Sequence, residues 1–467
     1  MNSALRALNG FGLGARPGER GRVRDPQGWL RAQLSGGPPT IAAPPDATPD
    51  AIAAALRSFR AVAQQGNDEQ RRQARQDARR RLIAIAAAES DAALTARVTS
   101  DRPFIERLVA FWSNHLCVST GAKVLVAPLA GSYEREAIRP HVLGRFADMV
   151  LASAKHPAML VYLDNFQSIG PSSRGARAGN RRGQQRGLNE NYARELLELH
   201  TLGVDGGYSQ QDVQELAKIL TGWTVSGLNR PGLGGRNRRA SATPDEDRIG
   251  FAFQEVLHEP GAKTVLGARY DDAGVAEGER VIRALCDHPS TARFVATKLV
   301  RHFVNDTPPP AAVDRIAGVF RNTRGDLRAV AEALIDLPDA WREPARKFRT
   351  PQDWLVAVLR AFNANDVAAA LMPILRQLRQ PLWSPAAPKG FDDGTAEWAD
   401  PDSLLNRAEL ARTVSRRLRL ERTDPAALLD VIDIGAGDQL HKFVSDTSIP
   451  ADERLALVLA GPAFQWR

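Results

Sequence analysis

The stretch LNENYARELLELHTLGVDGGYSQQDVQELAKILTGWTVSG, residues 188–227, carries the clearest structural signal in the chain. Asn189 is a suitable helix N-cap, and Gly203 stands where such a helix would stop. A second helix follows, opened by an acidic variant of the capping box from Ser209 to Asp212. Apolar residues recur at helical spacing in both segments, so each helix has one buried face. The stretch therefore predicts an antiparallel helical hairpin.

The rest of the chain has the same helical character. Strand signals are confined to residues 124–128 and 264–266, which we expect to form short β pieces. The prediction is a mainly α fold, built as a large irregular multi-helix domain with long loops and at most short β pieces. Two segments rich in Gly, Arg, Pro and Ser, residues 168–187 and 229–248, are predicted to be mobile loops.

We predict a single domain over residues 1–467, because recognisable segments run from the first residues to the last. Within it we expect N-terminal helices in 1–100, central motif-bearing helices in 101–305 and C-terminal helices in 306–467. A chain with 43% hydrophobic and 25% charged residues can bury a core. This composition excludes intrinsic disorder, which requires low hydrophobicity and high net charge.

The net charge of +8 needs interpretation, because only eight of the 62 basic residues are lysine. Arginine, alanine and glycine are all abundant, as a GC-rich coding bias produces, and we attribute part of the arginine excess to it. The basic residues are spread along helices without interleaved stacking aromatics, so nucleic-acid binding is the least favoured hypothesis. Its candidates would be loop arginines: Arg174, Arg177, Arg181, Arg182 and Arg186.

The two cysteines and the hydropathy of the chain limit the kinds of site and the cellular compartment that we expect. Cys117 and Cys286 lie far apart in apolar helical runs, which predicts free buried thiols rather than a metal or redox motif. No apolar run approaches the ~18 residues of a membrane span. The N-terminus lacks the apolar core of a signal peptide, so we expect a cytoplasmic protein. An exported or periplasmic protein is the alternative, should the start codon be misassigned.

Candidate catalytic groups lie along the first helix of the hairpin. Glu190 and Arg194 follow each other at i, i+4 with Glu195 beside them, and His200 projects into the apolar arc. One interpretation is a surface charge ladder with a histidine that satisfies terminal carbonyls. The other is an acidic row that faces a cleft and supplies general acid and base groups or oxygen ligands.

A second candidate is the helix PFIERLVAFWSNHLCVS, which starts at Pro103. His115 falls in the middle of its apolar face, with Asn114 at the border of that face. A buried histidine must satisfy both ring nitrogens internally or meet a ligand. We therefore interpret His115 either as a core histidine with a backbone partner or as a catalytic residue.

Several further polar residues are candidates for binding. Two helices begin with His-Pro, at His156 and His288, where the histidine is either a structural cap or exposed in a site. His258 lies in a loop with other charged residues. The predicted binding set is Asn114, His156, Asp164, Asn189, His258 and Lys263.

No standard catalytic template is present: HExxH, GxSxG, a Walker loop and the Rossmann glycine fingerprint are all absent. The chain nevertheless resembles the bacterial family called domain of unknown function 1800. The resemblance rests on LNGFGLGARPGE (8–19), FWSNHL (111–116), HPAMLVYLDN (156–165), the block at 189–223, LHEPGAKTVLG (257–267), HPSTARFVATKLV (288–300), LLNRAELA (404–411) and LALVLAGPAFQWR (455–467).

The resemblance implies a large, mainly helical bacterial protein. Genes of that family often lie next to those of the domain of unknown function 1501 family, so a protein of the latter family is the partner it suggests. It supplies no catalytic residues. The family pattern usually has a further histidine where this chain has Ser113. A metal site that used this position would be weakened here, although Ser113 points away from His115 on a helix projection.

Two hypotheses of function follow. The first is an enzyme, hydrolytic or metal-assisted, whose histidine and carboxylate site lies on the central helices. Mixed histidine and carboxylate ligands suit a divalent first-row transition metal, so such a cofactor is compatible with this hypothesis. The second is a non-enzymatic helical scaffold or partner of a domain of unknown function 1501 protein, favoured by the missing template and the two loops.

Overall fold

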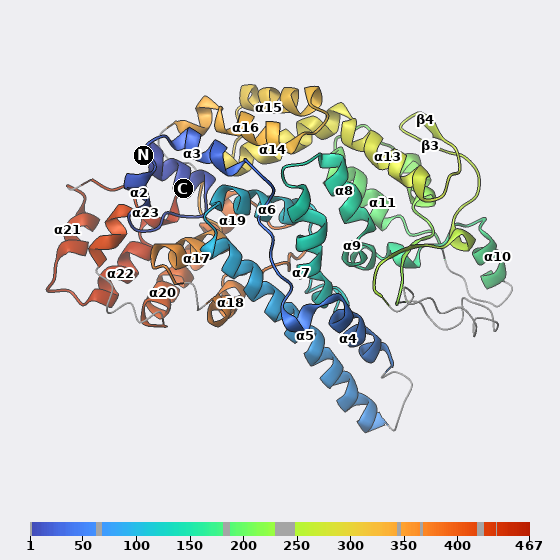
Figure 1. The fold of residues 1–467 in the computed structure, drawn as a ribbon, viewed down its shortest axis with the longest axis horizontal. Helices are drawn as coiled ribbons and strands as arrows, with labels where there is room; N and C mark the ends of the chain where they lie inside the picture. Colours follow the sequence, from blue (N-terminus) through green and yellow to red (C-terminus); the bar gives the residue numbers. More distant parts are fainter. Residues whose placement is uncertain are drawn as a thin grey trace.

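The computed structural model confirms the mainly α prediction, with 64% of the described residues in helices and 4% in strands (Figure 1). It describes residues 2–61, 68–180, 187–228, 248–342, 347–364, 368–417, 425–435 and 437–467. The predicted loop 229–248 lies almost wholly outside the described residues. The other predicted loop contains a helix, α10 (Arg174–Asn180), and three of its arginines at 181–186 lie outside the described residues.

The N-terminal part ends in one long helix that projects from the body of the molecule, with α4 packed along it (Figure 1). Residues 69–81 at the start of that helix are almost all exposed, so their arginines form a solvated surface. The elements are α1 (Ser3–Leu5), the π-helical η1 (Arg6–Phe11), α2 (Glu19–Arg22), α3 (Pro26–Gln33), α4 (Pro49–Ala61) and α5 (Asp68–Thr99).

The central part holds the segments with the strongest sequence signals. Its helices are α6 (Pro103–His115), α7 (Ala130–Tyr133), α8 (Phe146–Lys155), α9 (Pro157–Tyr162), α10, α11 (Asn191–Glu195), α12 (Gln210–Ile219), α13 (Val275–Asp287) and α14 (Pro289–Phe303). The C-terminal part adds α15 (Pro310–Asn322), α16 (Leu327–Ile335), α17 (Pro351–Ala361), α18 (Ala368–Gln377), α19 (Thr395–Trp398), α20 (Pro401–Arg417), α21 (Gln439–Ser445), α22 (Ala451–Ala460) and α23 (Pro462–Gln465).

The hairpin in residues 188–227 forms as predicted. Gly203 adopts φ 84°, a left-handed conformation that favours glycine, and ends the first helix. Ser209 and Asp212 make the reciprocal capping box of α12. The difference is that the first helix continues from α11 into a π-helical turn, η8 (Leu196–Thr201). Helical periodicity in a sequence does not distinguish a short π segment from an α-helix.

Strands are few and short, as expected, and they pair locally. β1 (Trp223–Val225) pairs antiparallel with β2 (Phe251–Phe253), and β3 (Lys263–Val265) with β4 (Ala268–Tyr270). The expected β piece at 264–266 is thus confirmed within one residue. The one at 124–128 is wrong: these residues form turns and a 3-10 helix, in which Pro128 lacks the N–H that a ladder needs.

Among the described residues, two large hydrophobic cores and one small cluster under α10 underlie the helices. The larger core joins the central helices to α15 and α16, and the other large core joins α17, α20 and α22 to the first residues of the chain. The two ends of the chain lie close together (Figure 1), and Arg6 donates a hydrogen bond to the carbonyl of Arg467. Both cysteines are free and buried, as predicted. In the described residues, no helix is long and apolar enough to cross a membrane.

Candidate functional site

The C-terminal end of α6 fastens a distant segment of the chain, residues 383–394. The Asn114 side chain both donates to the carbonyl of Phe391 (2.9 Å) and accepts from its N–H (2.8 Å). Ser119 donates to the carbonyl of Pro385 (2.8 Å). Gly390 has φ 82°, and a Cβ there would lie 2.4 Å from the Asn114 carbonyl oxygen, so only glycine fits. The FWSNHL motif therefore positions this segment.

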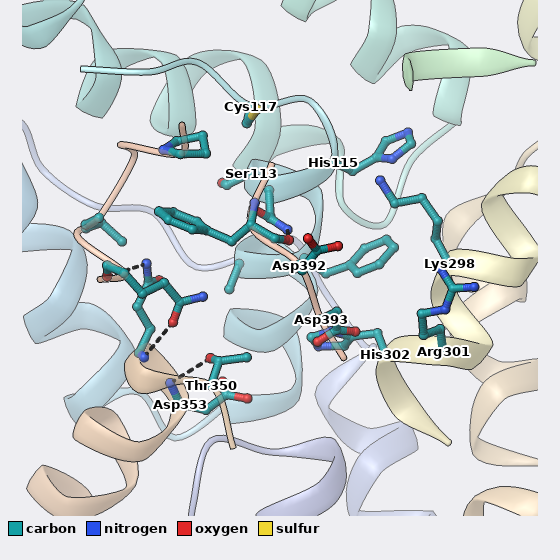
Figure 2. A pocket seen from close by; sticks show the side chains of 18 of the residues that line it. Ser113, His115, Cys117, Lys298, Arg301, His302, Thr350, Asp353, Asp392 and Asp393 are labelled. Atoms are coloured by element: carbon teal, nitrogen blue, oxygen red, sulfur yellow. Dashed lines mark hydrogen bonds and ion pairs between the residues drawn. The ribbon is translucent and has the colours of Figure 1, made fainter. Parts of the chain in front are cut away.

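Beneath the fastened segment lies a cavity of about 340 Å³, which we call the α14 cavity (Figure 2). This volume falls within the usual range for small-molecule sites, about 300–1,000 Å³. Helices α6 and α14, the start of α17 and residues 380–394 line it. Its polar lining includes Asn114, His115, Cys117, Lys298, Arg301, His302, Asp306, Asp353, Lys389, Asp392 and Asp393.

A histidine–carboxylate pair stands in the wall of this cavity. Nδ1 of His302, on the last turn of α14, lies 2.9 Å from Oδ2 of Asp393. Although burial opposes ionisation, His302 and Lys347 hold the pKa of Asp393 well below its usual value. Burial, which outweighs the nearby Asp393 carboxylate, lowers the pKa of His302. At neutral pH the imidazole is therefore neutral, donates its Nδ1–H to Asp393 and carries its lone pair on Nε2.

Asp393 is held from its other side by a buried lysine. Lys347 donates to the backbone carbonyl of Asp393 (2.6 Å) and to Oδ1 of Asp306 (2.5 Å). Asp306 in turn accepts from the Thr395 N–H (2.8 Å). In the described residues Nε2 of His302 has no hydrogen-bond partner, so it is the ring atom left to accept a proton. An oriented imidazole with a free nitrogen is the arrangement of a general base.

Two cations, Lys298 and Arg301, line the cavity from the same helix as His302. Lys298, one turn before His302 on α14, makes no hydrogen bond or ion pair within the described part of the chain. Its Nζ lies 5.5 Å from the Phe294 ring centroid. Burial lowers the pKa of Lys298 to about 8. Figure 2 shows its amine extending toward His115, with Arg301 beside it. Two neighbouring cations at one wall favour an anionic ligand.

The opposite wall is a structural ion cluster. Oδ2 of Asp353 lies 3.0 Å from Nη1 of Arg107 and 3.1 Å from Nε of Arg467. Despite burial, these two guanidiniums hold the pKa of Asp353 well below its usual range. Each arginine also donates to a backbone carbonyl, Arg107 to Gly12 and Arg467 to Gly10. The cluster therefore closes the cavity against the N-terminal segment.

Among the predicted catalytic residues, His115 lines the cavity but has a backbone partner. Its Nε2 lies 3.1 Å from the carbonyl oxygen of His200, and aromatic rings surround it. Burial lowers the pKa of His115 well below its usual value and that of His200 to about 3. Ser113 also lines the cavity, but its hydroxyl donates to Glu134 (3.0 Å), so positions 113 and 115 do not share a partner.

The other predicted catalytic residues lie outside the cavity. Glu190 accepts from Gln210 (2.7 Å) and lies 3.4 Å from Arg194, which joins α11 to α12. Burial raises the pKa of Glu195, with a smaller contribution from Glu198. The structure thus places these groups on the hairpin surface, and their catalytic role stays a prediction.

Three predicted binding residues have structural partners. His156 caps α9 by accepting the Ala158 N–H on Nδ1 (3.1 Å). Asp164 adopts φ 61° and pairs with Lys123 (2.6 Å). Asn189 donates to the carbonyl of Leu163 (3.1 Å). His288 caps α14 in the way that His156 caps α9.

The remaining two, His258 and Lys263, do converge. Nε2 of His258 lies 3.3 Å from Glu277 Oε2, 3.5 Å from Asp272 Oδ1 and 3.4 Å from Lys263 Nζ. We call these four residues the His258 cluster. In the described residues, its histidine and two carboxylates are the one group of three or more such side chains whose ligand atoms lie within 4.8 Å of one another.

Sequence reasoning missed the residues that shape the cavity, chiefly Lys298, His302 and Asp393. Lys298 and His302 stand at i, i+4 and so share one helix face, a signal that was present in the sequence. Asp393 comes from a segment 91 residues further along, and no local pattern connects it to His302.

Comparison with known proteins identifies a family but no activity. No curated protein and no solved structure matches the chain. The model of a family described as "Protein of unknown function (DUF1800)" matches residues 6–466, which covers both the α14 cavity and the His258 cluster. The chain therefore belongs to the DUF1800 family of proteins of unknown function.

Proposed function

We propose that the chain is an enzyme that hydrolyses a small anionic substrate in the α14 cavity. The observation that carries this proposal is the His302–Asp393 pair in the cavity wall, with Nε2 of His302 left without a partner. Lys298 and Arg301 supply the anion-binding side. The proposal keeps the hydrolytic enzyme expected from the sequence and moves its centre onto α14.

In this mechanism His302 activates water. The lone pair on Nε2 removes a proton from water as the water oxygen attacks the carbonyl carbon or the phosphorus of the substrate. The bond between that atom and the leaving group then breaks, and the imidazolium returns the proton to the leaving group. Asp393 fixes the ring orientation and stabilises the imidazolium that forms. Lys298 and Arg301 hold the anionic group of the substrate and the charge that develops in the transition state.

Water is the favoured nucleophile because no hydroxyl or thiol within the described residues is hydrogen-bonded to His302. Cys117, the thiol that lines the cavity, is 3.1 Å from the carbonyl oxygen of Pro388. Burial raises the pKa of this thiol to about 12, so it is protonated at neutral pH. A protonated thiol is a poor nucleophile.

The proposal is tested by assaying the purified chain against p-nitrophenyl phosphate, the p-nitrophenyl monoester of succinate, and neutral p-nitrophenyl acetate. We expect hydrolysis of an anionic substrate in preference to the neutral one, with the loss of that activity in His302→Gln. His288→Asn is the matched control, because it alters a histidine that caps the same helix. The absence of hydrolysis, or full activity in His302→Gln, would contradict the proposal.

Other expectations stay predictions. A non-enzymatic role as partner of a domain of unknown function 1501 protein, and a cytoplasmic rather than periplasmic location, follow from the sequence. Co-purification from the native host tests the partner, and fractionation of that host tests the location.

A further inference from the structure

The His258 cluster is assembled from separate short elements and loops, away from the α14 cavity. His258 follows the short 3-10 helix η10 (Glu255–Leu257), Lys263 begins β3, and Glu277 lies in the first turn of α13. Asp272 lies between β4 and α13. In Figure 1, β3, β4 and α13 lie together, away from α17 and α19. None of the four residues lines the α14 cavity.

The cluster is buried and has a deficit of positive charge. The Glu277 and Lys263 side chains are 0% and 2% exposed, and that of His258 is 4%. Besides the imidazole, the two carboxylates face the single ammonium of Lys263. Oε1 of Glu277 has no hydrogen-bond partner within the described residues, although it is completely buried. An unpaired buried carboxylate oxygen is costly and favours a further cation.

The imidazole of His258 is oriented as a metal ligand. Its Nδ1 lies 2.8 Å from the carbonyl oxygen of Thr221, so Nδ1–H donates there and the lone pair stays on Nε2. Ligating histidines in metal sites almost always donate their other ring N–H in this way. Nε2 is also the atom that lies nearest to both carboxylates.

The two distances from His258 to the carboxylates fit a metal site, and the two carboxylate ligand atoms lie within 4.8 Å of each other. With metal–ligand bonds of about 2.0–2.2 Å, neighbouring ligand atoms of a tetrahedral site lie about 3.3–3.6 Å apart. Nε2 of His258 lies 3.3 Å from Oε2 of Glu277 and 3.5 Å from Oδ1 of Asp272. Asp272 is 40% exposed, so the site has a route from solvent.

We propose that His258, Asp272 and Glu277 bind one divalent first-row transition-metal ion, and that the ammonium of Lys263 competes with this ion. A ligand set of one imidazole and two carboxylates suits such an ion better than calcium. Three protein ligands leave a further position for water or a ligand. Lys263 has an alternative anchor, because its Nζ also donates to the carbonyl of Glu259 (2.6 Å).

The test is titration of Co²⁺ into the EDTA-treated full-length protein, followed by visible absorption and by competition with Zn²⁺. We expect one equivalent to bind and give the absorption of a low-coordinate cobalt site. Asp272→Asn should weaken binding at least about tenfold, because it removes a charged ligand at the solvent side. Asp271→Asn is the matched control: this neighbour is 80% exposed and pairs with Arg269 outside the cluster.

Two outcomes overturn the proposal: wild-type protein that binds no stoichiometric Co²⁺, and Asp272→Asn that binds as tightly as Asp271→Asn. The role of Lys263 has its own measurement. Lys263→Met should bind Zn²⁺ at least roughly tenfold more tightly than wild type, since removing a like charge removes repulsion. Zn²⁺ should also raise its melting temperature more than that of wild type. If Lys263→Met binds Zn²⁺ no more tightly than wild type, Lys263 does not compete with the metal ion.

Discussion

The α14 cavity and the His258 cluster contain the same residue types and differ in how their lysines are paired. In the His258 cluster, Nζ of Lys263 contacts a carbonyl, an imidazole and a carboxylate, and the side chains touch one another. In the cavity, Lys298 makes no ion pair within the described residues and borders a space of about 340 Å³. The comparison shows that residue composition alone does not distinguish a compact ion network from an open site.

The difference has an energetic basis. Burying a charge without a partner disfavours its charged form, which is why burial lowers the pKa of Lys298 to about 8. Lys263 instead gains opposite charge and hydrogen bonds at close range. A protein retains a half-buried lysine without an ion pair at a cost in stability, and such perturbed groups concentrate at functional sites. Whether the lysine has an ion-pair partner therefore distinguishes the two sites. The α14 cavity, whose Lys298 is unpaired within the described residues, is open to an anionic ligand, whereas in the His258 cluster Lys263 already occupies the place that a metal ion would take.

The largest expected effect is on catalysis in the cavity. Asp393→Asn should lower hydrolysis of the anionic substrate about 10²–10⁴-fold, because the ring of His302 loses its orienting carboxylate. His288→Asn should leave it unchanged. The rate should fall with decreasing pH only below about pH 6.5, since the base must be neutral and the pKa of His302 lies below that value. A pH–rate profile of kcat/KM measures this, and unaltered rates in Asp393→Asn would contradict the assignment.

The next largest effect is on the free energy of unfolding, and it should be larger when Lys263 is replaced than when Lys298 is replaced. In EDTA, Lys263→Met should lower the free energy of unfolding by about 3–5 kcal/mol, because it leaves the buried carboxylate of Glu277 without its cation. Lys298→Met removes a charge that has no partner and should be neutral or stabilising. Urea denaturation of both variants measures the difference. Equal destabilisation would show that Lys298 has an ionic role in the fold.

Much of the fold could be predicted because its signals are local. The capping box at Ser209, the helix stop at Gly203 and the helix-initiating prolines depend on residues a few positions apart. The π-helical turn η8 could not be predicted, because the spacing of apolar residues does not distinguish a short π segment from an α-helix. The strand expected at residues 124–128 was wrong because apolar composition does not supply a pairing partner.

The site was predictable only where its residues are close in sequence. His258 and Lys263 are five residues apart, both were candidates from the sequence, and the structure brings them together. Asp272 and Glu277 follow on the next elements and carried no signal of their own. His302 and Asp393 meet only after α14 packs beneath the 383–394 segment. Contacts across such separations are set by packing, which a single sequence does not display.

A third prediction concerns the chemical reactivity of Lys298. With a pKa of about 8, half of its amine is neutral at pH 8, whereas an ordinary lysine with a pKa near 10.4 is about 0.4% neutral. Lys298 should therefore be acylated about 100-fold faster than exposed lysines at that pH. Peptide mass spectrometry after brief treatment with acetic anhydride measures the rates. Inorganic phosphate or succinate should protect Lys298, and labelling at the rate of Lys442 would contradict its unpaired state.

The smallest effect on stability and activity should come from the loss of the hydrogen bonds between Asn114 and Phe391, which hold residues 383–394 over the cavity. Asn114→Ala removes both hydrogen bonds to Phe391 and leaves two backbone groups unpaired, at a cost of about 1–2 kcal/mol in unfolding free energy. Because Asp393 is two residues further along, a looser segment should also lower kcat/KM, while Lys347 still holds the Asp393 carbonyl. A variant that loses stability but keeps full activity would show that Lys347 alone positions Asp393. Asn114 would then serve the fold, and its place in the cavity wall would have no part in binding the substrate.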